Sequence, residues 1–534
     1  MARLDRLPFE VLAIIAADLA PRDIHSTSLT CHRLHWALMH NDHIAKKTLQ
    51  ASRPEQGIDG LELKDASSRI FHGSSAHGLQ RFVKRQLAVT TANPFFAGVV
   101  AMADAFVYSN GMLCYTSHDR GTTMPNTLRL LDLRPPSSAE IVIHLKLIRF
   151  VGSDWNLKPL VEPIYYADGL VSCIFTPAST SQTKQNTHST LFVIRPASNE
   201  LVLTYPLARP GQEDYCFVRN TSEQVWIGEW ENVADGRGCL VLQLFDVPNR
   251  TWKLPHVRTP APVGDELGKT VCVEIIGNYM YVVSNSATSN ANQARDADWI
   301  SHYYAVRFPL AAPEKLEVAP KEGLWRRSHK EGPVYDTTIS LETDTHTGRL
   351  VIVEVRKESP EAVWPPVTTS YKTFLDFSPA ACSVSPVACK EQVSGLREAS
   401  LVHTLETSQR YSSYSPYIRS YHQDSESFLE VFPYYATVSG GEISPPTQPW
   451  LRLRSVAKSS EAMPAAFWPV GSTPNPCTKS NPYFDLNPRY PGRFQVQGTA
   501  DERSIVYALG ERGPNVLRPV VLLSFDPGHG HRCR

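Results

Sequence analysis

The residues with the clearest pattern for phosphate chemistry are Gly268, Lys269 and Thr270, which resemble the end of a phosphate-binding loop. That loop needs a glycine at the start of the G-x-x-x-x-G-K-[ST] pattern, so that backbone N–H groups can curl around the phosphates. Val263 stands at that place, and Gly264 is one position away. The sequence therefore predicts no nucleotide site here.

Histidine and cysteine side chains bind zinc when they lie at short, paired spacings. One group is formed by His529, His531 and Cys533 at the C-terminus, and another by Cys382 and Cys389. Neither group has the second set of ligands that a zinc site needs, and we interpret the C-terminal group as part of a frayed tail. The N-terminal segment carries five histidines, for which solvated helix surface is the favoured interpretation: His25, His32, His35, His40 and His43. We expect no metal and no cofactor.

Catalytic patterns are equally scarce. The nucleophile elbow G-x-S-x-G of serine hydrolases does not occur. Acidic and basic residues are interleaved, so no carboxylate pair for acid–base work can be singled out. Trp226, Trp230 and Trp252 fall at strand positions, which favours a place in the core over a stacking platform for nucleic acid. We therefore expect a protein that is not an enzyme.

The N-terminal 38 residues have a helical pattern that differs from the rest of the chain. Pro8 fits a first helical position, where its missing N–H costs nothing. Apolar residues then follow at the spacing of one helical face: Val11, Leu12, Ile15 and Leu19. Pro21 and Asp23 end this helix and begin a second one, which carries a further apolar set: Ile24, Leu29, Cys31, Leu34 and Leu38. Helices this short need an apolar partner surface.

This stretch resembles an F-box. The resemblance covers about 35 of 534 residues and rests on the Leu7-Pro8-x-Glu10 start and the Cys31-x-Arg33-Leu34 end, together with the apolar positions between them. His25, Thr27 and Thr30 stand where the family usually has aliphatic residues, which predicts a less tightly packed second helix. An ordinary amphipathic helix pair is the alternative interpretation.

The F-box resemblance implies docking onto a Skp-family adaptor and, through it, onto a cullin. The chain would then be a non-catalytic substrate-receptor subunit of a cullin–RING, SCF-type ubiquitin ligase. The negative charge of Glu10 would stabilise the first helix, because it lies near the positive N-terminal end of the helix dipole. The positions implied in the adaptor contact, or in holding the helices in shape, are Leu4, Leu7, Pro8, Glu10, Val11, Leu12, Ile15, Leu19, Ile24, Leu29, Cys31, Leu34 and Leu38.

Composition places further limits on function. Apolar residues make up 42% and charged residues 20% of the chain, which is a globular profile. Lys and Arg total 53, as do Asp and Glu, so no net charge attracts nucleic acid or acidic membranes. We recognise neither a secretory signal nor a membrane span, and the 10 cysteines form no disulfide framework. We expect a cytoplasmic or nuclear protein.

From about residue 99 the periodicity changes to that of β-strands. A unit of apolar strands and Gly, Asn, Asp or Pro turns recurs, with starts near residues 108, 166, 222, 276, 345, 423 and 500. Such a unit cannot bury its own faces, and radial closure would protect its edges. We predict a mainly β fold with a small N-terminal α module and a six- or seven-bladed β-propeller. Two β-sandwich domains are the alternative.

The strand repeats have no WD, kelch or leucine-rich signature. The combination of an F-box-like start with these repeats resembles a fungal-type F-box protein with a divergent propeller. We predict an F-box-like module in residues 1–45, a helical or irregular linker in 46–98 and the propeller in 99–534. Inserted loops are expected at 178–190, 284–297, 378–421 and 464–491. Other hypotheses are a propeller enzyme or ligand-binding protein with a helical start, and an adaptor-bound scaffold outside any ubiquitin ligase.

Overall fold

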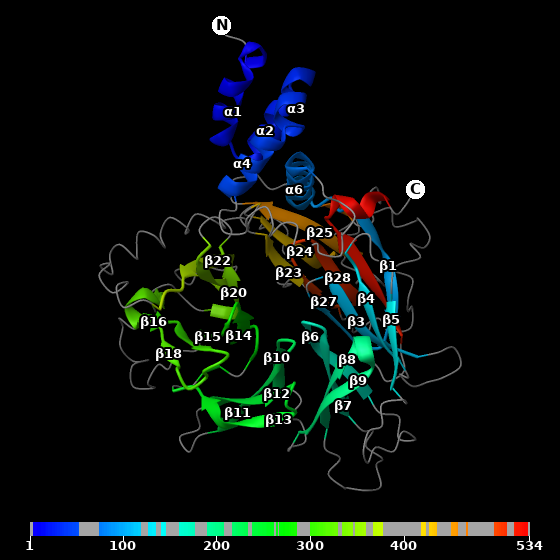
Figure 1. The fold of residues 1–534 in the computed structure, drawn as a ribbon, viewed down its shortest axis with the longest axis vertical. Helices are drawn as coiled ribbons and strands as arrows, with labels where there is room; N and C mark the ends of the chain where they lie inside the picture. The colour runs from blue at the N-terminus through cyan, green and yellow to red at the C-terminus, as the bar shows by residue number, and fades with distance from the viewer. Residues whose placement is uncertain are drawn as a thin grey trace, which may run out of the picture.

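Strands of the propeller and a stalk of N-terminal helices make up most of the residues that the computed structural model describes (Figure 1). It describes residues 4–52, 74–109, 111–118, 127–134, 140–145, 160–176, 189–207, 216–232, 238–260, 263–264, 266–285, 300–328, 334–344, 348–358, 367–377, 418–422, 425, 427–434, 450–457, 466–467, 496–509 and 517–531. Most of the predicted inserted loops lie outside these residues. The predicted insertion at 378–421 ends too late, because a strand already begins at Ile418.

The first four repeats each form one four-stranded antiparallel sheet, with β-branched and aromatic residues alternating between its faces. Their strands are β2 (Phe106–Ser109), β3 (Met112–Ser117), β4 (Thr127–Asp132) and β5 (Glu140–His144); β6 (Leu160–Ala167), β7 (Leu170–Thr176), β8 (Thr190–Arg195) and β9 (Glu200–Pro206); β10 (Cys216–Asn220), β11 (Gln224–Asn232), β12 (Gly238–Asp246) and β13 (Thr251–Arg258); and β14 (Val271–Ile276), β15 (Tyr279–Ser284), β17 (Tyr304–Pro309) and β18 (Glu317–Val318).

The last three repeats continue the series. The fifth gives a three-stranded sheet in the described residues, and the sixth and seventh give four-stranded sheets. Their strands are β20 (Val334–Thr343), β21 (Leu350–Glu358) and β22 (Val367–Phe374); β23 (Ile418–His422), β24 (Ser427–Tyr434), β25 (Trp450–Ala457) and β26 (Ala466–Phe467); and β27 (Val496–Ala500), β28 (Ser504–Leu509), β29 (Arg518–Ser524) and β1 (Phe96–Ala103). A separate ribbon pairs β16 (Ile300–His302) with β19 (Trp325–Ser328).

These sheets are arranged as the blades of a propeller (Figure 1). First strands of successive sheets contact one another, as in the pairs β2–β6, β6–β10, β10–β14, β14–β20, β23–β27 and β27–β2. The described strands thus make six four-stranded blades and a three-stranded sheet in the same ring. The prediction of a mainly β fold with a six- or seven-bladed propeller is confirmed.

The ring closes because the first strand of the chain joins the last blade. β1 pairs antiparallel with β29, from Phe96 opposite Ser524 to Ala103 opposite Arg518. The sequence did not predict this strand as a partner of the C-terminal repeat. Closure of this kind joins the two ends of the ring by backbone hydrogen bonds and leaves no gap between the first and last blades.

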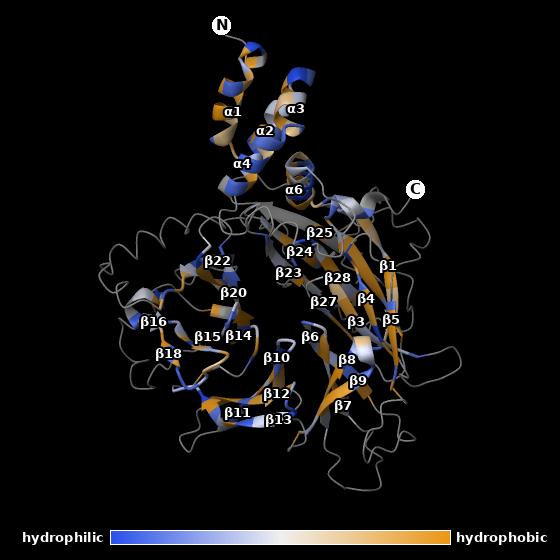
Figure 2. Cartoon of the chain, viewed as in Figure 1, coloured by the Kyte–Doolittle hydropathy of each residue, from blue (hydrophilic) through white to orange (hydrophobic). Residues whose placement is uncertain are grey.

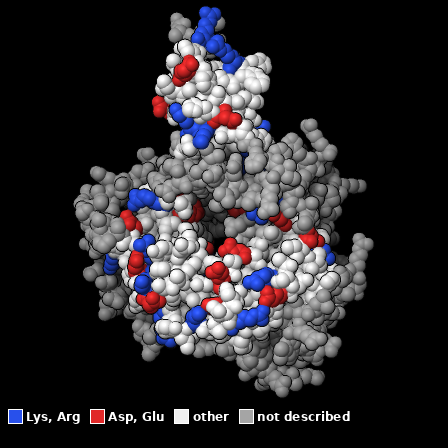
Figure 3. All heavy atoms as spheres, in the orientation of Figure 1, with Lys and Arg blue, Asp and Glu red and all other residues white. Residues whose placement is uncertain are grey.

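The hydrophobic core lies between neighbouring blades. Leu128 and Leu130 of the first blade, for example, share one buried cluster with Val171 and Phe192 of the second. Similar clusters join the second blade to the third and the third to the fourth. Hydrophobic residues therefore run along the strands of the ring (Figure 2), while its visible face mixes charges of both signs around a central hollow (Figure 3). Each blade depends on its neighbours for burial.

The helices form a stalk at the rim of the ring (Figure 1). They comprise the 3₁₀ turn η1 (Leu4–Arg6) and the helices α1 (Phe9–Ala17), α2 (Pro21–Ser28), α3 (His32–Met39), α4 (Asp42–Ser52) and α6 (Ser75–Thr90). The second predicted helix is therefore two helices. Among the described residues, no helix has both the length and the hydropathy to cross a membrane.

Two expectations about single residues are wrong. His529 is buried rather than part of a frayed tail, because its ring lies between Ser524 Oγ at 2.9 Å from Nδ1 and the Leu133 carbonyl at 2.5 Å from Nε2. His531 ends the 3₁₀ turn η13 (Pro527–His531), whereas Cys533, Cys382 and Cys389 lie outside the described residues. Trp226 is buried as expected, but Trp252 is exposed on the outer strand β13.

Candidate docking surface on the N-terminal helices

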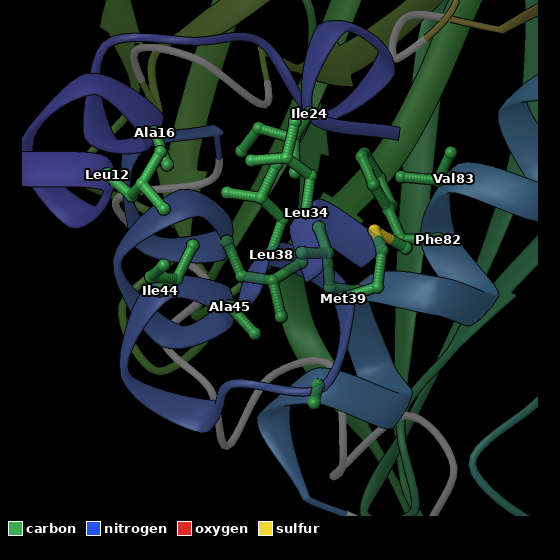
Figure 4. Packing of buried hydrophobic residues seen from close by; sticks show 13 residues of the cluster. Leu12, Ala16, Ile24, Leu34, Leu38, Met39, Ile44, Ala45, Phe82 and Val83 are labelled. Atoms are coloured by element: carbon green, nitrogen blue, oxygen red, sulfur yellow. The ribbon is translucent and has the colours of Figure 1, made fainter. Parts of the chain in front are cut away.

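The helical module has its own closed core. Leu12 and Ala16 of α1 point inward to meet Ile24 of α2 and Leu34 of α3, and Leu12 is only 3% exposed (Figure 4). The remaining buried members come from α3, α4 and α6: Leu38, Met39, Ile44, Ala45, Leu49, Ala76, Leu79, Phe82 and Val83. The spacing of Leu12 and Ala16 places both on one helical face, which explains why α1 packs in this orientation.

Local hydrogen bonds fix where these helices begin. Pro8 is the residue before α1, not its first helical residue, and α1 has no side-chain cap. Cys31 is the N-cap of α3, and its Sγ accepts the Leu34 N–H at 3.5 Å. The Asn41 side chain accepts the N–H groups of His43 and Ile44 at 3.0 and 3.1 Å, an arrangement that satisfies free donors at the start of α4.

Three polar residues stand where the F-box family usually has aliphatic ones, and they lie around the end of α2: His25, Thr27 and Thr30. The Thr30 hydroxyl donates to the Thr27 carbonyl at 2.7 Å, and the Ser28 hydroxyl donates to the His25 carbonyl at 2.7 Å. Both carbonyls also accept a backbone N–H, from Thr30 and Leu29 respectively, so each hydroxyl adds a second bond at the end of α2. The polar residues therefore lie where α2 ends, and Thr30 is exposed.

The residues implied by the F-box pattern divide into two groups. Those that hold the module together are buried or partly buried: Leu7, Leu12, Ile15, Leu19, Ile24, Cys31, Leu34 and Leu38. The others are exposed: Leu4, Pro8, Glu10, Val11 and Leu29. The structure brings Leu4, Pro8, Glu10 and Val11 together along η1 and the start of α1, whereas Leu29 lies at the end of α2.

Large apolar side chains cover the outside of this module. We define the outer apolar surface by its six exposed members: Leu4, Phe9, Val11, Ile14, Leu29 and Trp36. Ile14 and Leu29 are each 68% exposed, and Trp36 is 66% exposed. Several large apolar side chains exposed on one small folded module indicate a binding partner.

Phe9, Ile14 and Trp36 were not among the predicted contact residues. A signal for Ile14 was present, since it lies off the helical stripe that Leu12 and Ala16 define. Trp36 follows Leu34 in a helix whose inward positions are Leu34 and Leu38, so its outward direction also follows from helical spacing. Exposed aromatic residues matter because tryptophan is enriched among the residues that dominate binding energy.

The helix α6 joins the module to the propeller. Its first half packs through Leu79, Phe82 and Val83 into the core of the helical module. Its second half packs through Ala88 and Val89 into a cluster that contains residues of β23, β24, β25, β28 and β29. A single rigid helix therefore contributes to both cores, and the module has a fixed place on the ring.

Polar contacts join α6 both to the helical module and to the propeller. The Asp42 carboxylate accepts the Ala76 N–H at 2.9 Å, and the Gln80 amide donates to the Met39 carbonyl at 2.8 Å. On the propeller side, Arg81 Nη2 donates to both carboxylate oxygens of Asp526, at 3.0 and 3.1 Å. Burial alone would raise the pKa of Asp526, but Arg81 and hydrogen bonding outweigh it, so the pKa is lowered.

A second charged cluster lies inside the ring. The Glu354 carboxylate is fully buried and accepts from Arg326 at 2.6 Å, Arg356 at 2.6 Å and Tyr303 at 2.7 Å. Burial would raise the pKa of Glu354, but Arg356 and Arg326 lower it to about 2. The cluster joins β21 to β19 and to the residue before β17, which gives it a role in blade packing.

The described part of the chain contains no group of three or more His, Cys, Asp or Glu that could hold a metal ion. Gly268 takes a left-handed conformation in the turn before β14, and its carbonyl accepts the Ile339 N–H at 2.9 Å. That arrangement serves a tight turn that links two neighbouring sheets. The outer apolar surface is therefore the feature of the described residues that most clearly indicates binding.

Comparison with known proteins gives only distant structural similarities. No family model and no curated protein matches it. It is similar to the β-propeller domain of the Trilobed protease from Pyrococcus furiosus, at 10% identity over 80% of this chain and 95% of that one, with a TM-score of 0.32. The WD40 domain of SCAP from fission yeast is 7% identical over 81% of this chain and 98% of that one, with a TM-score of 0.39.

A third similar structure is the complex of KlAtg21 with the coiled coil of AgAtg16, at 8% identity over 77% of this chain and 93% of that one, with a TM-score of 0.33. These similarities are too distant to indicate a function. The strand pairing itself defines the class, and the chain is a β-propeller protein with an N-terminal helical region.

Proposed function

We propose that this protein is a substrate-receptor subunit of a cullin–RING ubiquitin ligase, which docks a Skp-family adaptor through its N-terminal helices. The observation that carries the proposal is the division within the F-box-like stretch. One set of its apolar residues closes a core, while Leu4, Phe9, Val11 and Ile14 remain exposed on η1 and α1. Exposed apolar side chains grouped on a folded module are typical of an interaction surface.

In this proposal the propeller holds a protein client and supplies no catalytic group. The chain raises the effective concentration of a client lysine near activated ubiquitin, which requires a defined geometry between the two ends of the receptor. Helix α6 supports that geometry because it packs into both cores. The protein would act in the cytoplasm or the nucleus, where cullin–RING ligases work.

The proposal is tested by co-expression of the full chain with a Skp-family adaptor, followed by co-purification. Wild type should retain the adaptor. Ile14→Glu should lose it without unfolding, because Ile14 is mostly exposed, and the double change Leu7→Ala and Pro8→Ala should also lose it. Leu254→Glu is the matched control, since Leu254 is 79% exposed on β13, in the third blade.

Three outcomes separate the hypotheses. Retention of both adaptor and cullin supports the receptor. Retention of the adaptor without a cullin supports a scaffold outside the ligase. If the wild-type chain never retains the adaptor, or if Ile14→Glu retains it as wild type does, docking through this surface is wrong.

A further inference from the structure

Two histidines on the exposed side of the helical module face each other. His35 lies in α3 and His40 is the C-cap of the same helix. Their Nε2 atoms are 3.3 Å apart, and the ring centroids are 5.1 Å apart at an interplanar angle of 65°. His40 is exposed and His35 is half-buried, so water and ions can reach the pair.

The distance between these nitrogens suits a shared metal ion. Two imidazole nitrogens bound to one tetrahedral ion at about 2.0–2.1 Å are about 3.3–3.4 Å apart. The measured 3.3 Å falls at this separation. Without metal, a single N–H···N hydrogen bond joins the rings, in which one histidine donates and the other accepts. Small rotations of the exposed rings would direct both lone pairs at one ion.

The surroundings leave the pair open to an ion. Trp36 stacks on His40 with ring centroids 4.4 Å apart and is itself exposed.

We propose that His35 and His40 form a binding site for one late first-row divalent transition-metal ion, with its remaining positions filled by water. Nitrogen ligands of this kind favour Cu²⁺ over Ni²⁺ and Zn²⁺ in the usual order of affinity. The site borders the outer apolar surface, because Trp36 belongs to that surface and lies beside His40, but neither histidine is a member of it.

The experiment is a titration of the full chain with Cu²⁺, read by tryptophan fluorescence. Because Trp36 lies beside His40, a bound Cu²⁺ should quench it, and the difference from the Trp36→Phe variant isolates this signal. We expect saturable quenching at one ion per chain, with competition by Zn²⁺. His35→Ala and His40→Ala should each weaken binding by about tenfold or more, since a lone exposed imidazole is a weak ligand.

The exposed His32 and His43 provide matched controls, and His32→Ala and His43→Ala should leave the titration unchanged. Circular dichroism of every variant verifies that the helices remain folded. Equal quenching of wild type and both pair variants would overturn the proposal. So would a wild-type quenching curve that does not differ from that of Trp36→Phe, or the absence of any saturable phase in the wild-type chain.

Discussion

Arg81 and Asp526 lie 445 positions apart in the sequence, and two hydrogen bonds of 3.0 and 3.1 Å join their side chains. Arg81 belongs to α6, and Asp526 follows the last strand of the ring. Arg503 adds a further positive charge 3.8 Å from the Asp526 carboxylate. This contact, together with the two apolar cores that share α6, fixes the helical module on the propeller.

The Arg81→Met variant tests this contact. It removes both charged hydrogen bonds and leaves the buried Asp526 carboxylate with less compensation, which should cost about 2–3 kcal/mol of unfolding free energy. Chemical denaturation measures the loss, and hydrogen exchange should show faster exchange in α6. Arg6→Met in the exposed 3₁₀ turn is the control and should change neither.

The lowered pKa of Asp526 predicts how stability depends on pH. The contribution of a carboxyl with a lowered folded-state pKa is present above its ordinary pKa and is lost as the pH falls through the folded-state value. Wild type should therefore lose stability on acidification more steeply than Arg81→Met. If the unfolding free energies of wild type and Arg81→Met fall equally steeply as the pH is lowered, the ion pair does not contribute in this way.

Glu354→Gln should destabilise the propeller strongly. The change removes the charge that compensates Arg326 and Arg356 in the interior, and breaking a buried pair in this way costs about 3–5 kcal/mol. Thermal denaturation measures the loss. Glu317→Gln is the control, because its ion pair with Arg307 lies at the surface and surface pairs contribute little.

The pKa of Glu354 sets a second pH window. Because Arg356 and Arg326 lower it to about 2 in the folded protein, the stability that it contributes is fully present above its ordinary value of 4.5. That contribution is lost as the pH falls from 4.5 towards 2. A stability difference between wild type and Glu354→Gln that stays constant from pH 4.5 to pH 2 would contradict the assignment.

Leu12 and Ile14 form a matched pair on one helix. Leu12→Ala removes a buried side chain from the module core and should cost about 2–5 kcal/mol. Ile14→Ala should change stability by no more than about 0.5 kcal/mol, because the side chain is mostly exposed. Denaturation followed by the far-ultraviolet helical signal separates the two. A large stability loss in Ile14→Ala would mean that the outer apolar surface is part of a core.

Much of this fold could be predicted from local sequence patterns. The seven strand repeats correspond to the six four-stranded blades and the three-stranded sheet, because alternation and turn residues are encoded within each unit. The inward position of Leu12, Ile24 and Leu34 also follows from helical spacing. These features depend on residues close together in the chain.

Features that depend on distant residues could not be predicted in this way. The pairing of β1 with β29 joins residues more than 400 positions apart in the sequence, so no local pattern predicts it. His529 has the sequence context of a tail and is buried only because the ring closes over it. The break between α2 and α3 was missed because no glycine or proline marks the end of α2 at Ser28.

The same limit applies to the docking surface. The helical pattern predicted the inward positions of the first helices, but it could not show that Val11 and Leu29, which belong to the same pattern, remain exposed. Packing in the assembled module decides which side chains are buried, since α4 and α6 cover Leu38 and leave Ile14 and Trp36 outside. The predicted contact residues therefore included several that only hold the module together.

The most direct test of the central claim is calorimetric titration of the purified full chain with a purified Skp-family adaptor. We expect saturable binding of one adaptor per chain, and its loss in Ile14→Glu while Leu254→Glu binds as wild type does. Absence of binding by the wild-type chain, or equal affinity in wild type and Ile14→Glu, would contradict adaptor docking through the outer apolar surface.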